Sequence, residues 1–137
     1  MKILVVDDDF VTRTKLLTLL EPYGHCDGAQ NGDEALKKFK DAHEKSEPFK
    51  LITMDIDMPG MNGHEVVEKI RNWESENNSY ENSTEAKILM VTSMQSRTDL
   101  IGSFSEGCEW FLKKPITPED LEESLAKISI PKPISSS

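Results

Sequence analysis

Four short apolar segments, each followed directly by charged or hydroxyl-bearing residues, constrain the fold of this chain more than any other feature of its sequence. Each segment has the length of a buried strand rather than of a helix. Strands that are apolar on both faces are typical of a parallel sheet covered by helices on both sides. The segments, with the residues that follow them, are Ile3–Val6 before Asp7, Asp8 and Asp9; Phe49–Met54 before Asp55; Ile88–Val91 before Thr92; and Trp110–Leu112 before Lys113 and Lys114.

Stretches in which apolar residues recur at helical spacing lie between and after these segments. They are Phe10–Leu20, Ala35–Phe39, Val66–Trp73, Leu100–Phe104 and Leu121–Ile128. A weaker and more polar strand is predicted over residues 25–30, where it would form an edge of the sheet. Five strand–helix units of this kind predict an α/β, doubly wound (βα)5 fold, with a parallel sheet, right-handed crossovers and helices on both faces.

Charge and length exclude several classes of protein. The 137 residues carry 16 basic and 25 acidic side chains, a net charge of −9, so direct nucleic-acid binding through a basic surface is not expected. No apolar run approaches the roughly 18 residues of a membrane-spanning helix, so membrane insertion is not expected either. Because no signal-peptide pattern precedes the first strand, we expect a cytoplasmic protein. One domain is predicted over residues 1–129, followed by a proline- and serine-rich, disordered tail at 130–137.

The carboxyl ends of parallel strands meet at one edge of the sheet, where α/β proteins bind their ligands. The carboxylates of Asp7, Asp8 and Asp55 should therefore converge there. Carboxylates so close repel one another unless a proton, a lysine or a hard cation offsets their charge. An all-oxygen cluster without nearby His or Cys is typical of Mg²⁺, with Mn²⁺ also possible. Lys114 adds a positive charge and Thr92 a hydroxyl donor, which predicts a site for an oxyanion beside a carboxylate.

Four motifs, in their order and spacing, resemble those of the response-regulator receiver domain of two-component signalling, chemotaxis receivers included. They are ILVVDDD at 3–9, MDIDMPGMNG at 54–63, ILMVTS at 88–93 and FLKKP at 111–115. The resemblance covers residues 2–129 and implies a flavodoxin-like sheet with the strand order 2-1-3-4-5. It also implies a sensor histidine kinase or a histidine phosphotransfer protein as the phosphoryl donor, and a downstream effector protein as a further partner.

The resemblance implies roles for the acidic residues at the strand ends. Asp55 would be the phosphoacceptor, forming an acyl phosphate, and would also contact the metal. Asp8 would be the main Mg²⁺ carboxylate, with Asp7 assisting, and Asp57 would contribute its backbone carbonyl. Such a domain would catalyse only its own phosphorylation and dephosphorylation, so it would not be an enzyme acting on a separate substrate.

The remaining roles concern the oxyanion and the switch. Thr92 would donate a hydrogen bond to the phosphoryl group, and Lys114 would pair with that group or with Asp55. Pro115 would fix the turn that aims Lys114. Phe111 occupies the aromatic switch position, so Thr92 and Phe111 would couple phosphorylation to the face formed by the fourth helix, the fifth strand and the fifth helix.

Several positions depart from the commoner pattern of the family. Phe111 is not a tyrosine, so its switching would change burial without a hydroxyl contact. Asp57 and Met94 stand at positions that tune the lifetime of the phosphate, and Ser93 replaces the more frequent alanine or glycine. The polar stretch 74–85 is longer than usual and is predicted to be a flexible insertion without structure.

Histidines and cysteines are predicted to be structural. His25, His43 and His64 lack the spacing of metal ligands and are expected at the surface. Cys26 and Cys108 fall near opposite edges of the expected sheet, so no disulfide is predicted.

Two alternatives use the same acidic residues. Asp55 and Asp57 match the Asp-x-Asp of haloacid-dehalogenase-type phosphatases, although Pro59 stands where that motif has Thr or Val, and the chain is too short for a cap domain. A pseudo-receiver would keep the fold as an unphosphorylated interaction module, which the intact set of acids, threonine and lysine disfavours. Within the receiver interpretation, the sequence does not separate an effector from a phosphorelay intermediate, or a stand-alone protein from part of a longer one.

Overall fold

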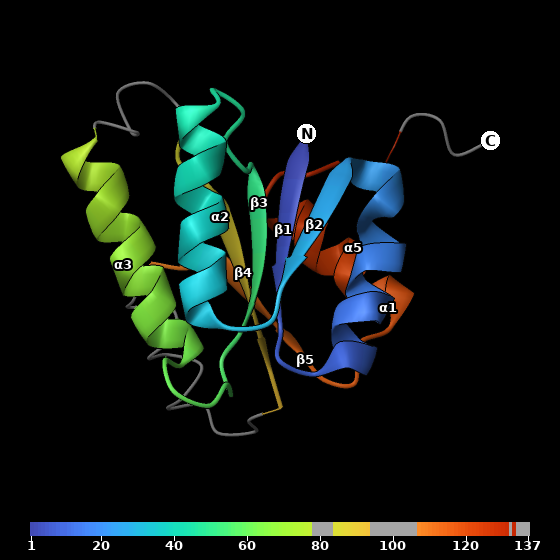
Figure 1. Cartoon of the computed structure of the whole chain (residues 1–137). Coiled ribbons are helices and arrows are strands. Elements are labelled where there is room, and N and C mark those ends of the chain that lie inside the picture. Colours follow the sequence, from blue (N-terminus) through green and yellow to red (C-terminus); the bar gives the residue numbers. More distant parts are fainter. Residues whose placement is uncertain (78–83, 94–106, 132, 134–137) are drawn as a thin grey trace.

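Five parallel strands form one sheet in the predicted order, β2-β1-β3-β4-β5 (Figure 1). The computed structural model describes residues 1–77, 84–93, 107–131 and 133. The strands are β1 (Lys2–Val6), β2 (His25–Ala29), β3 (Leu51–Asp55), β4 (Lys87–Thr92) and β5 (Trp110–Lys113). Their carboxyl ends all point to one edge of the sheet, which is the lower edge in Figure 1.

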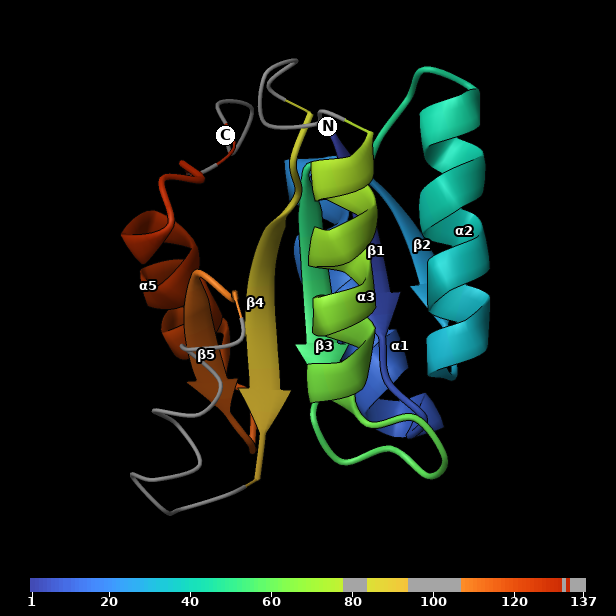
Figure 2. The ribbon, with the colours of Figure 1, turned by 90° about the vertical axis from the view of Figure 1, so that its left-hand side faces the viewer.

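Helices cover both faces of the sheet, as predicted. They are α1 (Phe10–Leu20), the 3-10 helix η1 (Glu21–Tyr23), α2 (Gly32–Glu44), α3 (Gly63–Glu76) and α5 (Pro118–Lys127). Helices α2 and α3 lie side by side on one face (Figure 2), and α1 and α5 lie on the other. The predicted helix at 100–104 falls outside the described residues. No helix in the described part of the chain is long and apolar enough to cross a bilayer.

Alternation along β1 divides the apolar core into two layers, because successive side chains of a strand point to opposite faces. Leu4 and Val6 pack with the buried residues of α2 and α3, whereas Ile3 and Val5 pack with those of α1 and α5. All four side chains are at most 1% exposed. The first strand therefore lies in the middle of the molecule, and the acidic residues that follow it are held by packing on both sides.

Side-chain caps determine where the α-helices begin. Each cap is an Asp, Asn or Thr whose oxygen accepts a hydrogen bond from the backbone N–H three residues later, which satisfies a donor that the first turn leaves unpaired. The caps are Asp9, Asn31, Asn62 and Thr117. Helix α3 also begins at Gly63, where a Cβ would collide with the carbonyl oxygen of Asp55. Only glycine allows this helix to start so close to the end of β3.

A lysine side chain from α2 donates hydrogen bonds to the edge strand β2. Lys38 donates hydrogen bonds through its Nζ to Asp27 Oδ1 at 3.0 Å and to the carbonyl oxygen of Gly28 at 2.5 Å. The same Asp27 Oδ1 accepts a hydrogen bond from the N–H of Gly28 at 2.8 Å. A charged lysine on a short polar edge hinders pairing with another strand.

Two predictions about exposure were wrong at particular residues. Phe10, assigned to the buried stripe of α1, is 69% exposed, because the first turn of α1 extends past the sheet. His43, assigned to the surface, is half-buried and packs against Phe39 and Trp73, with ring centroids 4.9 and 4.5 Å away. His64 is likewise half-buried, and His25 is exposed as predicted. The two cysteines are free thiols, also as predicted.

The stretch 74–85 is not wholly unstructured, contrary to the prediction. Helix α3 continues to Glu76, and the side chain of Glu74 is fully buried. Its Oε1 pairs with Arg71 at 2.7 Å, and its Oε2 accepts a hydrogen bond from the N–H of Ala86 at 2.7 Å. Polar composition suggested a loop, but this acidic residue is stabilised inside the protein by an arginine one helical turn earlier. Residues 78–83 lie outside the described part.

Arg71 joins three segments at the amino-terminal ends of β4 and β5. It donates hydrogen bonds to the carbonyl oxygens of Ala86 and Gly107 at 2.8 and 2.9 Å. It also binds both carboxylate oxygens of Glu109, at 2.8 and 3.0 Å. Both of these bonds come from the same terminal nitrogen of Arg71, and hydrogen bonds between charged groups are roughly twice as strong as those between neutral groups.

Removing this guanidinium should destabilise the protein strongly. Arg71→Met leaves the fully buried carboxylate of Glu74 without its cation. We expect the free energy of unfolding to fall by about 3–5 kcal/mol, as for other buried pairs that lose one partner. Urea denaturation of Arg71→Met and of Lys69→Met, a matched control at an exposed position of α3, measures the difference. Equal stabilities for the two variants would contradict the role of the cluster.

Candidate functional site

Three carboxylates converge at the carboxyl edge of the sheet, as predicted. One oxygen from each of Asp7, Asp8 and Asp55 lies within 4.8 Å of the other two. Asp7 and Asp55 are 0% and 1% exposed, whereas Asp8 faces solvent. Asp7 and Asp8 directly follow β1, and Asp55 is the last residue of the adjacent strand β3. The pairing of these two central strands therefore brings the acids together.

Backbone groups hold the two buried acids in place. Asp7 Oδ1 accepts a hydrogen bond from the N–H of Asp9 at 2.9 Å, and its own N–H donates to the carbonyl oxygen of Ala29 at 3.0 Å. Asp55 Oδ1 accepts from the N–H of Asp57 at 3.2 Å. These bonds restrict the rotation of both carboxylates, so the cluster is organised in advance of any ligand.

Lys114 is the cation of the site. Its Nζ lies 3.4 Å from Asp7 Oδ2 and 3.5 Å from Asp55 Oδ1. Its backbone N–H donates to the carbonyl oxygen of Thr92 at 2.8 Å, and its peptide bond to Pro115 is cis. Burial alone would lower the pKa of Lys114, but the carboxylates of Asp55 and Asp7 outweigh it and raise the pKa above its usual value. Lys114 is therefore charged at neutral pH.

Asp55 carries an unusually basic carboxylate. Burial, followed by the negative charge of Asp7, raises the pKa of Asp55 to about 7, although Lys114 and the N–H of Asp57 act in the opposite direction. A single lysine thus offsets only part of the repulsion between two buried carboxylates.

The donor set fits a hard divalent cation. Asp7 Oδ2 is buried and makes no hydrogen bond, so its contact with Lys114 is an ion pair only. Together with Asp8 and Asp55, it offers an all-oxygen set of the kind that Mg²⁺ prefers. Magnesium typically uses one or two carboxylates and keeps several waters. Because Asp8 is exposed, water can reach the cluster from its side, as such coordination requires.

The other predicted site residues surround the acids. Thr92, at the end of β4, is fully buried. The side chain of Asp57 is exposed, and its Oδ2 accepts a hydrogen bond from the hydroxyl of Ser93 at 3.2 Å. Phe111 is half-buried on β5, and its ring stacks on that of Trp110 at a centroid distance of 5.5 Å. Met94 lies outside the described residues.

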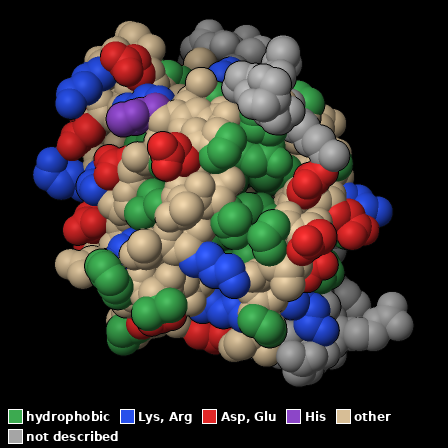
Figure 3. Space-filling view, turned by 90° about the vertical axis from the view of Figure 1, so that its right-hand side faces the viewer, with side chains coloured by type: hydrophobic (Ala, Val, Ile, Leu, Met, Phe, Trp, Pro, Cys, Tyr) green, Lys and Arg blue, Asp and Glu red, His purple; other side chains and the backbone are tan. Residues whose placement is uncertain are grey.

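Two features near the site were not predicted from the sequence. Phe10 and Val11 are 69% and 71% exposed on the first turn of α1, next to the acids. Val11 also lines a depression of about 400 Å³ that reaches Lys114 and Pro115. In the sequence, Phe10 and Val11 resemble the other apolar residues of α1. Their exposure depends on where the helix extends past the sheet, which the sequence alone does not show. Figure 3 shows the face covered by α1 and α5, where apolar side chains alternate with charged ones.

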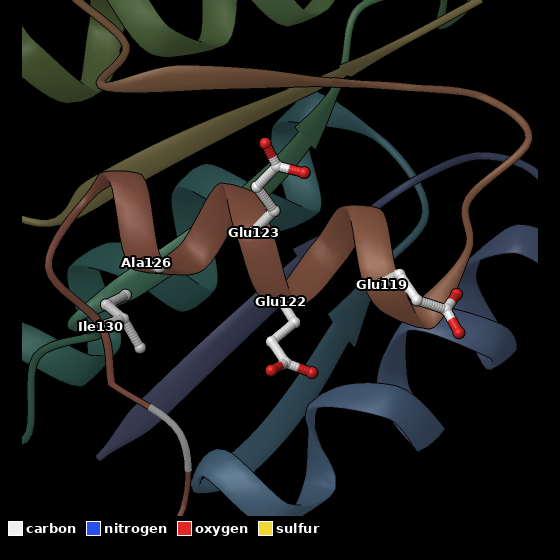
Figure 4. A pocket seen from close by; sticks show the side chains of 5 residues that line it. All are labelled: Glu119, Glu122, Glu123, Ala126 and Ile130. Atoms are coloured by element: carbon white, nitrogen blue, oxygen red, sulfur yellow. The ribbon is translucent and has the colours of Figure 1, made fainter.

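A second depression, of about 270 Å³, lies along α5. Three glutamates, Glu119, Glu122 and Glu123, line it together with Ala126 and Ile130 (Figure 4). The side chains of Glu122 and Glu123 point in different directions. Among the described residues, the cluster of acids able to hold one cation is that of Asp7, Asp8 and Asp55.

Comparison with known proteins places the chain in a family. The family model of the response regulator receiver domain matches residues 3–126, so the chain belongs to this family and is a receiver domain of two-component signal transduction. A chemotaxis protein CheY homolog of Campylobacter jejuni is 35% identical over 130 residues, which cover 93% of this chain and 92% of the relative.

Solved structures agree with this assignment. Chemotaxis protein CheY4 of Vibrio cholerae has a TM-score of 0.76 and 30% identity, covering 93% of this chain and 97% of that chain. A co-crystal structure of the Saccharomyces cerevisiae histidine phosphotransfer protein Ypd1 with the receiver domain of Ssk1 has a TM-score of 0.76 and 25% identity. The match covers 91% of this chain and 86% of that chain.

The raised pKa of Asp55 predicts a pH-dependent effect on stability. An acid whose pKa is higher in the folded than in the unfolded state costs stability as the pH rises between the two values, here from about 4 to about 7. Asp55→Asn keeps the oxygen that accepts from Asp57 and removes the charge. In metal-free buffer, we expect it to be more stable than the wild type by on the order of 4 kcal/mol at pH 8, since the pKa is raised by about three units and each unit corresponds to about 1.4 kcal/mol.

Urea denaturation at pH 5 and pH 8 with a chelator measures this difference, which should be much smaller at pH 5. Added Mg²⁺ should reduce the difference at pH 8, because a cation stabilises the ionised wild-type site. A variant less stable than the wild type at pH 8 without metal would contradict the repulsion between the acids.

Proposed function

We propose that this receiver domain accepts a phosphoryl group on Asp55 from a phosphorylated histidine of a sensor kinase or a histidine phosphotransfer protein. The observation that carries the proposal is the position of Asp55, buried at the end of β3, with carboxylate oxygens of Asp7 and Asp8 within 4.8 Å and the ammonium of Lys114 at 3.5 Å. The family match, over residues 3–126, favours this reaction over a haloacid-dehalogenase-type phosphatase.

In the proposed reaction, an ionised oxygen of Asp55 attacks the phosphorus atom in line with the bond to the donor nitrogen. An oxygen–phosphorus bond forms, the phosphorus–nitrogen bond breaks, and the imidazole keeps the electron pair and takes up a proton. Phosphoryl transfer of this kind depends mainly on positioning and charge neutralisation. The ammonium of Lys114 and the hydroxyl of Thr92, at the ends of β5 and β4, stabilise the transferred oxygens.

Asp8 and Asp7 are the proposed carboxylate ligands of Mg²⁺, with Asp55 and the backbone carbonyl of Asp57 completing the protein's contribution. When bound, the ion neutralises charge on the phosphoryl oxygens. The three carboxylates within 4.8 Å and the Oδ2 of Asp7, which makes no hydrogen bond, support this assignment. The domain acts only on its own aspartate, so it signals rather than turning over a separate substrate.

The proposed donor docks over α1, beside the acids. A partner that presents a histidine to a buried aspartate must cover the adjoining surface, and an exposed apolar patch rimmed by charges is typical of such interfaces. Phe10 and Val11 form such a patch. The yeast receiver domain crystallised with a histidine phosphotransfer protein shares the fold and supports a partner of this class.

The proposed domain reaches slightly further than the sequence suggested. Ile130, assigned to the tail, is 6% exposed, and its N–H donates to the carbonyl oxygen of Leu125 at 2.9 Å. We therefore place the end of the cooperative unit after Ile130 rather than after residue 129. A cytoplasmic location, where kinases and phosphotransfer proteins act, fits the proposed function.

Mass spectrometry of the intact protein tests the phosphoacceptor. Incubation with acetyl phosphate and Mg²⁺ should add one phosphoryl group, and omission of Mg²⁺ or the change Asp55→Asn should abolish the addition. Asp57→Asn, which alters the neighbouring exposed acid, should still be phosphorylated. Full modification of Asp55→Asn would refute the assignment. Failure of the wild type with acetyl phosphate and with phosphohistidine donors would favour an unphosphorylated interaction module.

The switch residues make a second prediction. Beryllium fluoride with Mg²⁺ mimics a phosphoryl group, and its binding should move Phe111 if Thr92 and Phe111 couple the site to the face of β5 and α5. The indole N–H resonance of Trp110 should then shift, because its ring stacks on Phe111 at an interplanar angle of 6°. Trp73, which packs between α2 and α3, is an internal control that should shift little. Shifts confined to the loops around Asp8 and Asp55 would contradict the coupling.

A further inference from the structure

The backbone carbonyl of Asp7 lies just past the end of the β1–β2 ladder. The last residue pair of this ladder is Val6 with Ala29, and the N–H of Asp7 donates to the carbonyl oxygen of Ala29 at 3.0 Å. Beyond this point the chain leaves β2 and enters α2, whose cap is Asn31. The next hydrogen bond comes from a side chain instead, since Arg13 donates through one terminal nitrogen to the carbonyl oxygen of Asp7 at 2.7 Å.

A backbone hydrogen bond, packing against β2 and a cation–π contact hold Arg13 in this position. Its own N–H donates to the carbonyl oxygen of Asp9 at 2.9 Å, within the first turns of α1. Its side-chain stem lies against the backbone of β2, where a Cβ at Gly28 would be 3.4 Å from Arg13 Cδ. Its guanidinium carbon lies 5.6 Å from the ring centroid of Phe10, in the range of a cation–π contact. A half-buried side chain held in this way has little freedom to leave the carbonyl.

The carbonyl that Arg13 binds belongs to the peptide unit that links Asp7 to Asp8. Because a peptide unit is planar and rotates as one body, the hydrogen bond fixes the orientation of that plane and hence the direction in which both acidic side chains leave the backbone. A bond from a charged guanidinium is also stronger than one from a neutral donor.

We propose that Arg13 is a positioning residue for the metal site: it contacts no ligand, but holds the Asp7–Asp8 peptide in the orientation that lets both carboxylates bind one Mg²⁺. The proposal rests on the metal site of the proposed function. Residues that hydrogen-bond to the metal-binding residues without contacting the metal typically contribute 10–100-fold to metal affinity. The same side chain touches Phe10, so the proposed docking surface on α1 and the acidic cluster share one arginine.

Magnesium titrations of the intact chain without any phosphoryl donor test this role, with amide NMR shifts of the residues around Asp8 as the readout. Arg13→Met, which keeps most of the packing but has no donor, should raise the dissociation constant for Mg²⁺ about 10-fold. Arg13→Lys, which keeps the charge but lacks the planar guanidinium, should recover only a minor part of the loss. Lys15→Met, which removes one positive charge from an exposed position of the same helix, should stay within about twofold of the wild type.

Three outcomes would overturn the proposal: affinity of Arg13→Met within twofold of the wild type, full recovery in Arg13→Lys, or an equal loss in Lys15→Met. The last two would make the effect one of charge rather than of orientation. If urea denaturation shows that Arg13→Met does not fold, the comparison of Arg13→Lys with Lys15→Met still decides between these outcomes. Absence of Mg²⁺ binding by the wild type would refute the metal site itself, whereas absence of phosphorylation on Asp55 with normal Mg²⁺ binding would refute only the proposed function.

Discussion

Repulsion between the buried carboxylates of Asp7 and Asp55 is the constraint on which the site depends. Two negative charges at the ends of neighbouring central strands cost stability, and Lys114, at 3.4 and 3.5 Å, offsets only part of that cost. The fold tolerates the arrangement because β1 and β3 are packed on both faces and cannot separate to relieve it. Burial, together with the repulsion that remains, raises the pKa of Asp55 to about 7. A cation or an oxyanion that binds beside Lys114 therefore enters a site whose side chains are already held in place.

The opposite end of the sheet holds a second ionic cluster, whose hydrogen bonding differs from that of the site. There Arg71 lies between the carboxylates of Glu74 and Glu109 and also binds backbone carbonyls, so its donors are well used. This cluster joins the amino-terminal ends of β4 and β5, whose carboxyl ends carry Thr92 and Lys114. Both clusters place two carboxylates against one cation. The oxygens of Glu74 and Glu109 accept hydrogen bonds from the guanidinium and from backbone N–H groups, whereas Asp7 Oδ2 accepts none. The difference separates a structural ionic cluster from a functional one more clearly than burial does.

Much of the fold and nearly all of the acidic site could be predicted from the sequence, because both depend on local signals. Apolar strands of a few residues predict a parallel sheet, and the residue at the end of such a strand must lie at its carboxyl edge, as Asp7 and Asp55 do. The errors have a common cause in tertiary context. Glu74 looks like part of a polar loop until Arg71 and the N–H of Ala86 are brought to it, and Phe10 looks like a core residue until α1 is seen to pass the edge of the sheet. Arg13 carries no local signal, since its partner is a backbone carbonyl.

In the proposed reaction, the repulsion also links metal binding to the reactivity of Asp55. A carboxylate must be ionised to attack phosphorus, yet a pKa of about 7 leaves a substantial part of the metal-free molecules protonated at neutral pH. Lowering that pKa requires positive charge close to Asp55, and Lys114 alone does not supply enough. Asp7 and Asp8 are the proposed metal carboxylates. Residues that orient these two side chains therefore also influence how much of Asp55 is ionised. By linkage, any group that holds those carboxylates in place, as we propose for Arg13, favours metal binding and ionisation of Asp55 together.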